Sequence, residues 1–197
     1  MTIQPIVEGH GEVDALPVLL RRIAAARGES ELTVMRPIRI HRSRLAHVGE
    51  LERATELAAR LAGPEGRILI VVDANGDCPA MLGPEWQRRA SLVRPNLHVG
   101  VVLAKSEFES WFLASFPSLR GYRGVSTSAE VPDDPEAIRG AKEHLRRYME
   151  AGHHYSETID QVALAARMDL DLATRNSRSF RKLLREFARL MSCGFPD

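Results

Sequence analysis

Short apolar runs alternate with amphipathic segments over the first 116 residues. Apolar runs typical of buried strands cover residues 2–7, 67–72 and 97–104. The second of these is uninterrupted, as in a parallel-sheet strand that is covered on both faces. Apolar positions with helical spacing predict helices at residues 12–26, 48–61, 84–93 and 106–116. This alternation predicts an α/β fold with a doubly wound, mainly parallel sheet and helices on both faces.

Two further segments indicate how the chain is organised. The run at 32–40 has strand character but contains Pro37, so we expect an edge strand or a break there. After Pro117 a long loop rich in Gly, Ser and Pro is expected, followed by helices at 135–151, 158–167 and 177–191. We therefore expect an α/β core (1–116) and a loop with a C-terminal helical extension packed on that core (117–197).

Composition adds few constraints. Hydrophobic residues make up 44% of the 197 residues, which is enough for a substantial core. The formal net charge of +1 neither predicts nor excludes binding to nucleic acid. Two distant cysteines, Cys78 and Cys193, and the absence of a signal-peptide pattern favour a cytoplasmic protein. No apolar run is long enough to cross a membrane, so no membrane partner is expected.

Each of the three predicted buried strands ends in an acidic turn. The polar side chains of these turns are Glu8, His10 and Glu12, then Asp73, Asn75 and Asp77, then Glu107 and Glu109. Ligands of open parallel sheets bind beyond the carboxyl ends of the strands. If the first two strands are neighbours, about 4.8 Å apart, Glu8 and Asp73 are placed to share one cation. Hard oxygen ligands of this kind suit Mg²⁺, with Mn²⁺ as a second candidate.

Several of these residues also have purely structural interpretations. Glu12 could complement the positive end of a helix dipole, and residues 73–77 could form a turn closed by Asx side-chain bonds. Ser106 with Glu109 has the spacing of a helix capping box, as does Thr158 with Gln161. His10 is as well explained by a surface turn as by a contact with metal or substrate.

Together these motifs resemble the Toprim domain, the catalytic fold of topoisomerases, bacterial primases and nucleases of the overcoming-lysogenization-defect type. The resemblance is closest to small bacterial Toprim-like proteins of unknown function, and it spans most of the chain. The segments that carry it are Val7-Glu8-Gly9, Ala15-Leu16-Pro17-Val18-Leu19-Leu20, residues 73–79, residues 107–114 and residues 177–184.

The resemblance implies a magnesium-dependent nuclease or phosphodiesterase with a Toprim-like doubly wound sheet. Glu8 matches the family glutamate, a general acid/base and metal ligand, and Asp73 matches the first metal-binding aspartate. Asn75 stands where the family has a second aspartate, and an amide lacks the charge. Asp77 could substitute for it; otherwise the site binds metal weakly or is degenerate. The third acidic position is matched by Glu109, with Glu107 as second choice.

A phosphodiesterase also needs cations for the scissile phosphate. The candidates are Lys182, taken as catalytic, and Arg175, Arg178 and Arg181, taken as phosphate-binding. Arg178, Arg181, Lys182 and Arg185 are three or four residues apart, so they share one predicted helical face. A solvated basic face with no ligand explains the same spacing.

The partners expected from the resemblance are nucleic acid and, in an anti-phage setting, an ATPase or another defence protein. A homo-oligomer is also open. Two other functions compete with the nuclease: a catalytically degenerate Toprim-like module that binds nucleic acid or protein, and an enzyme acting on a small phosphorylated substrate. Asn75 favours the degenerate module.

Overall fold

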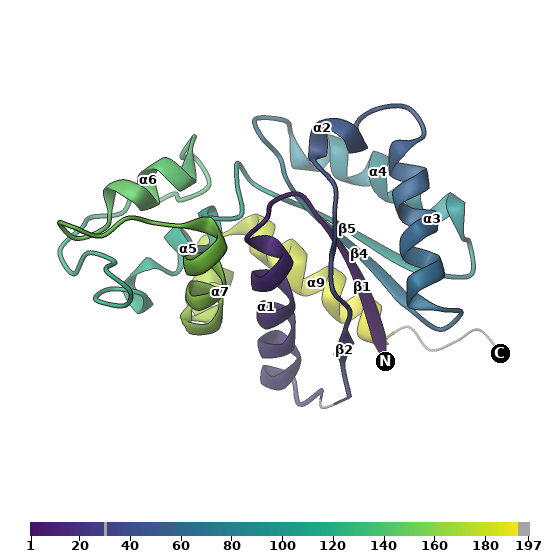
Figure 1. Cartoon of the computed structure of the whole chain (residues 1–197), viewed down its shortest axis with the longest axis horizontal. Coiled ribbons are helices and arrows are strands. Elements are labelled where there is room, and N and C mark those ends of the chain that lie inside the picture. The colour runs from purple at the N-terminus through teal and green to yellow at the C-terminus, as the bar shows by residue number, and fades with distance from the viewer. Residues whose placement is uncertain (30, 193–197) are drawn as a thin grey trace.

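The computed structural model describes residues 1–29 and 31–192, and Cys193 therefore lies outside the described residues. Within them, five parallel strands form one sheet in the order β2-β1-β4-β5, with β3 also paired to β1 (Figure 1). The strands are β1 (Thr2–Val7), β2 (Thr33–Val34), β3 (Ile38–Arg39), β4 (Arg67–Asp73) and β5 (His98–Ala104). The predicted α/β fold with a parallel sheet is confirmed.

The edge formed by β2 and β3 follows from Pro37. The two short strands lie on either side of this proline, and both pair with the same edge of β1. Pro37 has no N–H to donate, so the ladder is interrupted at that residue. The expected edge position and break of residues 32–40 are both confirmed.

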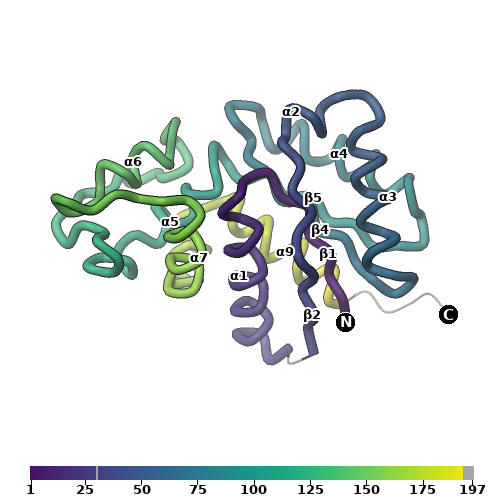
Figure 2. The backbone as a smooth tube through the Cα atoms, in the orientation of Figure 1, coloured from purple at the N-terminus to yellow at the C-terminus, as the bar shows by residue number. Residues whose placement is uncertain are grey.

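The strands bury side chains on both faces, with alternate residues in two separate hydrophobic clusters. Leu69 and Val71 of β4 pack with α1 (Glu12–Ala26), α5 (Ser110–Ala114), α7 (Glu157–Arg167) and α9 (Arg178–Ser192). Ile68 and Ile70 face α3 (Glu50–Ala62) and α4 (Pro79–Val93). The strands run between these two sets of helices, with α1 and α7 on one side and α3 and α4 on the other (Figure 2).

Three predicted helices differ from the observed ones. The helix expected at 106–116 is reduced to α5 and a short 3-10 turn (Phe116–Ser118), because Ser106 has a φ of 67°, outside the helical region. The helix expected at 135–151 is only α6 (Ala141–Arg147), which begins after Gly140 at a φ of 68°. Helix α4 starts at Pro79 rather than at Pro84, because a proline fits the first turn.

Two short helices were not predicted, α2 (Arg42–Leu45) and α8 (Leu170–Asn176). Both predicted capping boxes are wrong. Glu109 makes no capping bond, and the N-terminus of α7 is closed by Asp160, whose carboxylate accepts from the Ser156 N–H at 2.7 Å. Glu109 and Gln161 are thereby left for other contacts. No helix among the described residues is long and apolar enough to span a membrane.

Gly11, just before α1, permits the close approach of this helix to α7. A methyl group at residue 11 would overlap the Glu157 carbonyl and the Gln161 side chain. The backbone of Gly11 is right-handed, so alanine is excluded by space and not by conformation. We expect Gly11→Ala to lower the free energy of unfolding by about 1–3 kcal/mol in urea titrations.

Gly83→Ala is the matched control for Gly11→Ala. Gly83 lies within α4, and a methyl group there meets only the end of the Leu103 side chain. Alanine is also the better helix former, so we expect a change below about 1 kcal/mol. Equal losses in the two variants would show that the contact between α1 and α7 is not tight.

Candidate functional site

The carboxyl ends of β1, β4 and β5 form one edge of the sheet. Val7 is in register with Val71, and Asp73 is in register with Ala104. The strands that precede Glu8 and Asp73 are therefore neighbours, as the sequence analysis required. The acidic turns after the three strands meet at this edge.

Glu12 turns back from the first turn of α1 towards the end of β1. Its Oε2 accepts a hydrogen bond from the Glu8 N–H at 3.1 Å, and only 2% of the residue is exposed. Burial raises the pKa of Glu12 to about 7; backbone N–H donors oppose the shift, while the charges of Glu109 and Glu8 add to it. Glu12 is therefore part of the acidic cluster as well as of the helix terminus.

Glu8 has one carboxylate oxygen without a partner. Its Oε1 lies 3.5 Å from Nε2 of His41, the residue that caps α2. Its Oε2 is buried and makes no hydrogen bond among the described residues. A buried, unpaired carboxylate oxygen is unfavourable, because it has lost water and gained no donor. This oxygen is the clearest sign that the edge is built to hold a ligand.

Asp73 connects the end of β4 to the turn after β5. Its Oδ1 accepts a hydrogen bond from the Phe108 N–H at 2.8 Å. Burial raises the pKa of Asp73 well above its ordinary value, and the negative charges of Glu12, Glu109, Glu8 and Glu107 raise it further. The cluster therefore carries mutual repulsion that a cation would relieve.

The helical extension supplies the partners of the third acidic turn. The buried Glu109 Oε1 accepts from the Tyr155 hydroxyl and from Gln161 Nε2, each at 3.0 Å. Burial raises the pKa of Glu109, against the effects of Lys142 and of the two hydrogen bonds. Glu107 accepts from the backbone N–H of Lys142 at 2.8 Å.

Lys142 is a functional candidate that the sequence analysis missed. Its ammonium group lies 3.1 Å from the Glu157 carboxylate. Burial acts to lower the pKa of Lys142, but the attraction of Glu109, Glu157 and Glu107 outweighs it, and the pKa is raised. Lys142 is thus a cation within electrostatic range of the acidic cluster. Its sequence gives no signal of this role, because α6 reaches the edge only through tertiary packing.

Three predicted site residues lie outside the cluster. Asp77 is exposed and pairs with Arg42 of α2. Asn75 is exposed in a left-handed turn with a φ of 48°, and only its backbone N–H reaches back, to the Ser106 carbonyl. His10 is exposed in the first turn. The structure therefore brings Glu8, Glu12, Asp73 and Glu109 together, with Glu107 beside them, but not Asp77.

The cluster does not have the geometry of a closed metal site. Across residues 1–29 and 31–192, no three acidic, histidine or cysteine side chains are arranged to hold a metal ion. The fit to a divalent cation rests on the unpaired Glu8 oxygen, on the repulsion within the cluster and on its hard oxygen donors. Glu8, Glu12 and Asp73 are the residues that fit.

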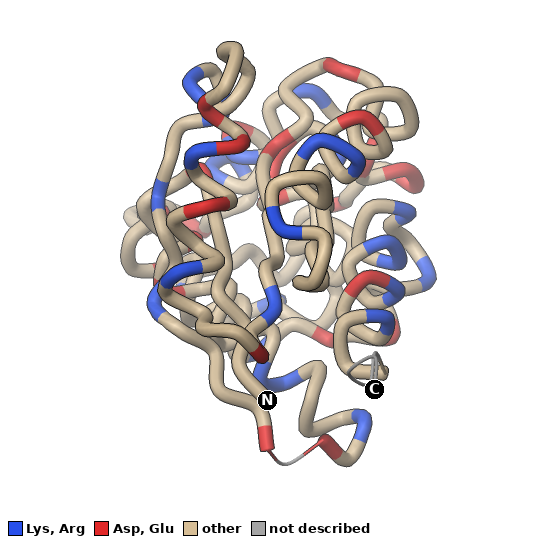
Figure 3. Tube along the Cα trace, turned by 90° about the vertical axis from the view of Figure 1, so that its right-hand side faces the viewer, with Lys and Arg blue, Asp and Glu red and all other residues tan. Residues whose placement is uncertain are grey.

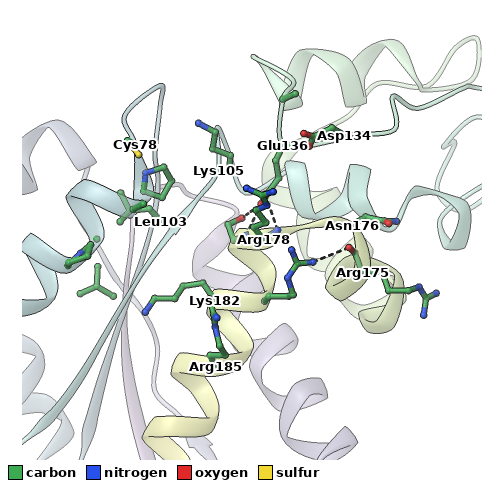
Figure 4. A pocket seen from close by; sticks show the side chains of 18 of the residues that line it. Cys78, Leu103, Lys105, Asp134, Glu136, Arg175, Asn176, Arg178, Lys182 and Arg185 are labelled. Atoms are coloured by element: carbon green, nitrogen blue, oxygen red, sulfur yellow. Dashed lines mark hydrogen bonds between the residues drawn. The ribbon is translucent and has the colours of Figure 1, made fainter.

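The predicted basic residues line a cavity of about 990 Å³ beside the acidic edge (Figure 4). Arg175 and Arg178 have no ion-pair partner in the part of the chain that the structure describes. Arg181 donates to the carbonyls of Thr174 and Arg175 at the end of α8, and Lys182 pairs with Glu186. The expected shared face of α9 is observed.

The fold and this edge define a class: an α/β protein with a parallel sheet whose carboxyl end gathers buried carboxylates. Residues 7–188 match the family described as Domain of unknown function (DUF4276), and the chain belongs to that family. Searches of curated proteins and of solved structures gave no match.

Proposed function

We propose that this protein is a magnesium-dependent phosphodiester hydrolase of Toprim type that acts on nucleic acid. One observation carries the proposal: the buried Glu8 Oε2 has no partner within a cluster of carboxylates whose pKa values are raised by burial and mutual repulsion. Such a cluster at the carboxyl edge of a parallel sheet favours a cation and an anionic substrate.

Glu8, Glu12 and Asp73 are the proposed ligands of Mg²⁺ or Mn²⁺. When bound, such an ion neutralises charge on a phosphate and makes a bound water a better nucleophile. Asp77 leaves the proposed ligand set, because Arg42 holds its carboxylate. Glu109 is held by Tyr155 and Gln161, so it contributes negative charge at a fixed position behind the ligands.

The remaining roles belong to proton transfer and phosphate binding. The unpaired oxygen of Glu8 is the best-placed proton acceptor for an attacking water. Lys182 lies in the cavity and pairs with Glu186, so its proposed role is phosphate binding rather than catalysis. Lys142, beside Glu107 and Glu109, is the lysine placed to balance the charge of the acidic cluster.

The activity test uses single- and double-stranded DNA and RNA with Mg²⁺ or Mn²⁺. We expect cleavage of at least one substrate, dependent on the metal and absent in EDTA. Failure to cleave any of the four substrates with either metal would contradict the proposal.

A second candidate is a Toprim-like module that binds nucleic acid or a protein without cleaving it. It is favoured by Asn75, which is exposed and carries no charge where the resemblance leads us to expect an aspartate. Calorimetric titration with Mn²⁺ separates the two functions. Binding at micromolar to millimolar Mn²⁺ supports the hydrolase, and no heat of binding at millimolar Mn²⁺ supports the module.

A further inference from the structure

The cavity between α4, the open edge of β5 and α9 has the size of a ligand site. Its volume of about 990 Å³ is at the upper end of the range for small-molecule sites, roughly 300–1,000 Å³. Val101 and Leu103 of β5 form its floor, and Cys78 and Lys105 lie at one end (Figure 4). A single phosphate would fill only a small part of this space.

The walls of the cavity carry an excess of positive charge. The cationic residues are Lys105, Arg175, Arg178, Arg181, Lys182 and Arg185. Among the described residues, Lys105, Arg178 and Arg185 have no ion-pair partner. Elsewhere, Lys and Arg positions are interspersed with Asp and Glu positions (Figure 3), and the net charge is only +1. The attraction for an anion is therefore local to this cavity.

The acidic residues of the cavity do not cancel this charge. Glu136 accepts hydrogen bonds from the backbone N–H groups of Arg178 and Ser179 and from the hydroxyls of Ser177 and Ser179, at 2.6–2.9 Å. It thus serves the N-terminus of α9. Asp134 accepts from the Glu136 N–H at 3.0 Å, and Asp133 is exposed.

The spacing of the cations suits a chain of phosphates. Arg178, Lys182 and Arg185 follow one face of α9 over seven residues, or about 10 Å along the helix axis. No aromatic side chain lines the cavity, so no base-stacking platform is present among the lining residues. A ligand held in this way is recognised by its backbone and not by its bases.

The open edge of β5 is already occupied by side chains, which argues against a peptide added as a further strand. Gln87 donates to the Val99 carbonyl and accepts from the Val101 N–H at 2.9 Å. Arg189 donates to the same Val99 carbonyl. Strand addition needs these backbone groups free.

The cavity leads to the acidic edge. Lys105 follows Ala104, which is the register partner of Asp73. We propose that this cavity is a groove that binds the phosphate backbone of single-stranded nucleic acid and directs it to the carboxylates. The role of the groove in catalysis rests on the proposed function, but its binding does not. A duplex, with a major groove alone about 12 Å wide, is too large for this space.

The test measures fluorescence anisotropy of a labelled twelve-nucleotide dT strand in EDTA. The variant Arg178→Gln/Arg185→Gln leaves the backbone bonds to Glu136 in place. We expect its affinity to fall about tenfold or more, and the slope of log K against log salt to fall by about 1.4, or 0.7 per phosphate contact. The matched control Arg27→Gln/Arg88→Gln removes two exposed arginines outside the cavity, and its affinity should match the wild type.

Three results would overturn the groove: wild-type affinity in Arg178→Gln/Arg185→Gln, a wild-type protein that binds a duplex as tightly as the single strand, or equal competition by an acidic polypeptide. Because binding is measured without divalent metal, these results leave the proposed hydrolysis standing. Conversely, tight binding of the strand without cleavage would contradict the hydrolase and support the groove.

Discussion

Asp73→Asn is expected to reduce metal-dependent hydrolysis about 1,000-fold or more while the protein stays folded. Residues that merely support a metal ligand are worth about 10–100-fold, and loss of a ligand charge should exceed that. The asparagine Oδ1 can still accept from the Phe108 N–H, so the link between β4 and the turn after β5 is retained. Initial rates with Mn²⁺, together with thermal unfolding, measure both parts of the expectation.

Asp77→Asn is the matched control, since Asp77 follows the same strand but pairs with Arg42 outside the cluster. We expect its rate to stay within about threefold of the wild type, because an exposed ion pair contributes little. A large loss in Asp77→Asn with a normal rate in Asp73→Asn would reverse the assignment of ligands.

The metal-free protein is expected to lose stability as the pH rises from 4.5 to 7. The pKa of Glu12 is about 7 in the folded protein and 4.5 as its ordinary value. Across this window the folded protein keeps a proton on Glu12 that the unfolded chain has released, so each rise in pH favours unfolding. At 1.36 kcal/mol per pH unit, the free energy of unfolding falls by about 3 kcal/mol.

Denaturant titrations in EDTA at several pH values measure this loss, and Glu12→Gln should remove most of it. Asp14→Asn is the control, because Asp14 is an exposed carboxylate in the same helical turn. Mg²⁺ should restore stability to the wild type at pH 7 but not to Glu12→Gln. A flat or rising stability of the wild type over this window would show that the cluster is not under repulsion.

Carboxylates with lowered pKa values do not produce this slope. Hydrogen bonds from Arg94 and Arg60 lower the pKa of Glu56 to about 2. Its contribution to stability is fully present above its unfolded pKa and is lost only as the pH falls towards 2. The window between pH 5 and 7 therefore reports mainly on the acidic edge.

The sequence predicted the sheet and its acidic edge because both follow from local rules. The runs that became β1, β4 and β5 are apolar enough to be buried, and parallel strands bring their carboxyl ends together. Glu8 and Asp73 could therefore be placed on one edge before any coordinates were known. The break at Pro37 followed from its missing N–H.

The errors arise where tertiary contacts override local pattern. Ser106 leaves the helical region in a turn that is hydrogen-bonded to Asn75 and, two residues on, to Asp73. Asp77 is drawn outward by Arg42, which belongs to a helix that the pattern did not predict. Gln161, which has the spacing of a cap, instead holds Glu109 across 52 residues of sequence. Contacts at such separations leave no periodic signal in the sequence.

The central claim is that Glu8 and Asp73 hold one divalent cation at the carboxyl edge of the sheet. An anomalous difference map from a Mn²⁺-soaked crystal tests it most directly. We expect a peak within about 2.5 Å of carboxylate oxygens of both residues. A map with no peak at this edge at millimolar Mn²⁺, or with a peak only beside Asp77, would contradict the claim.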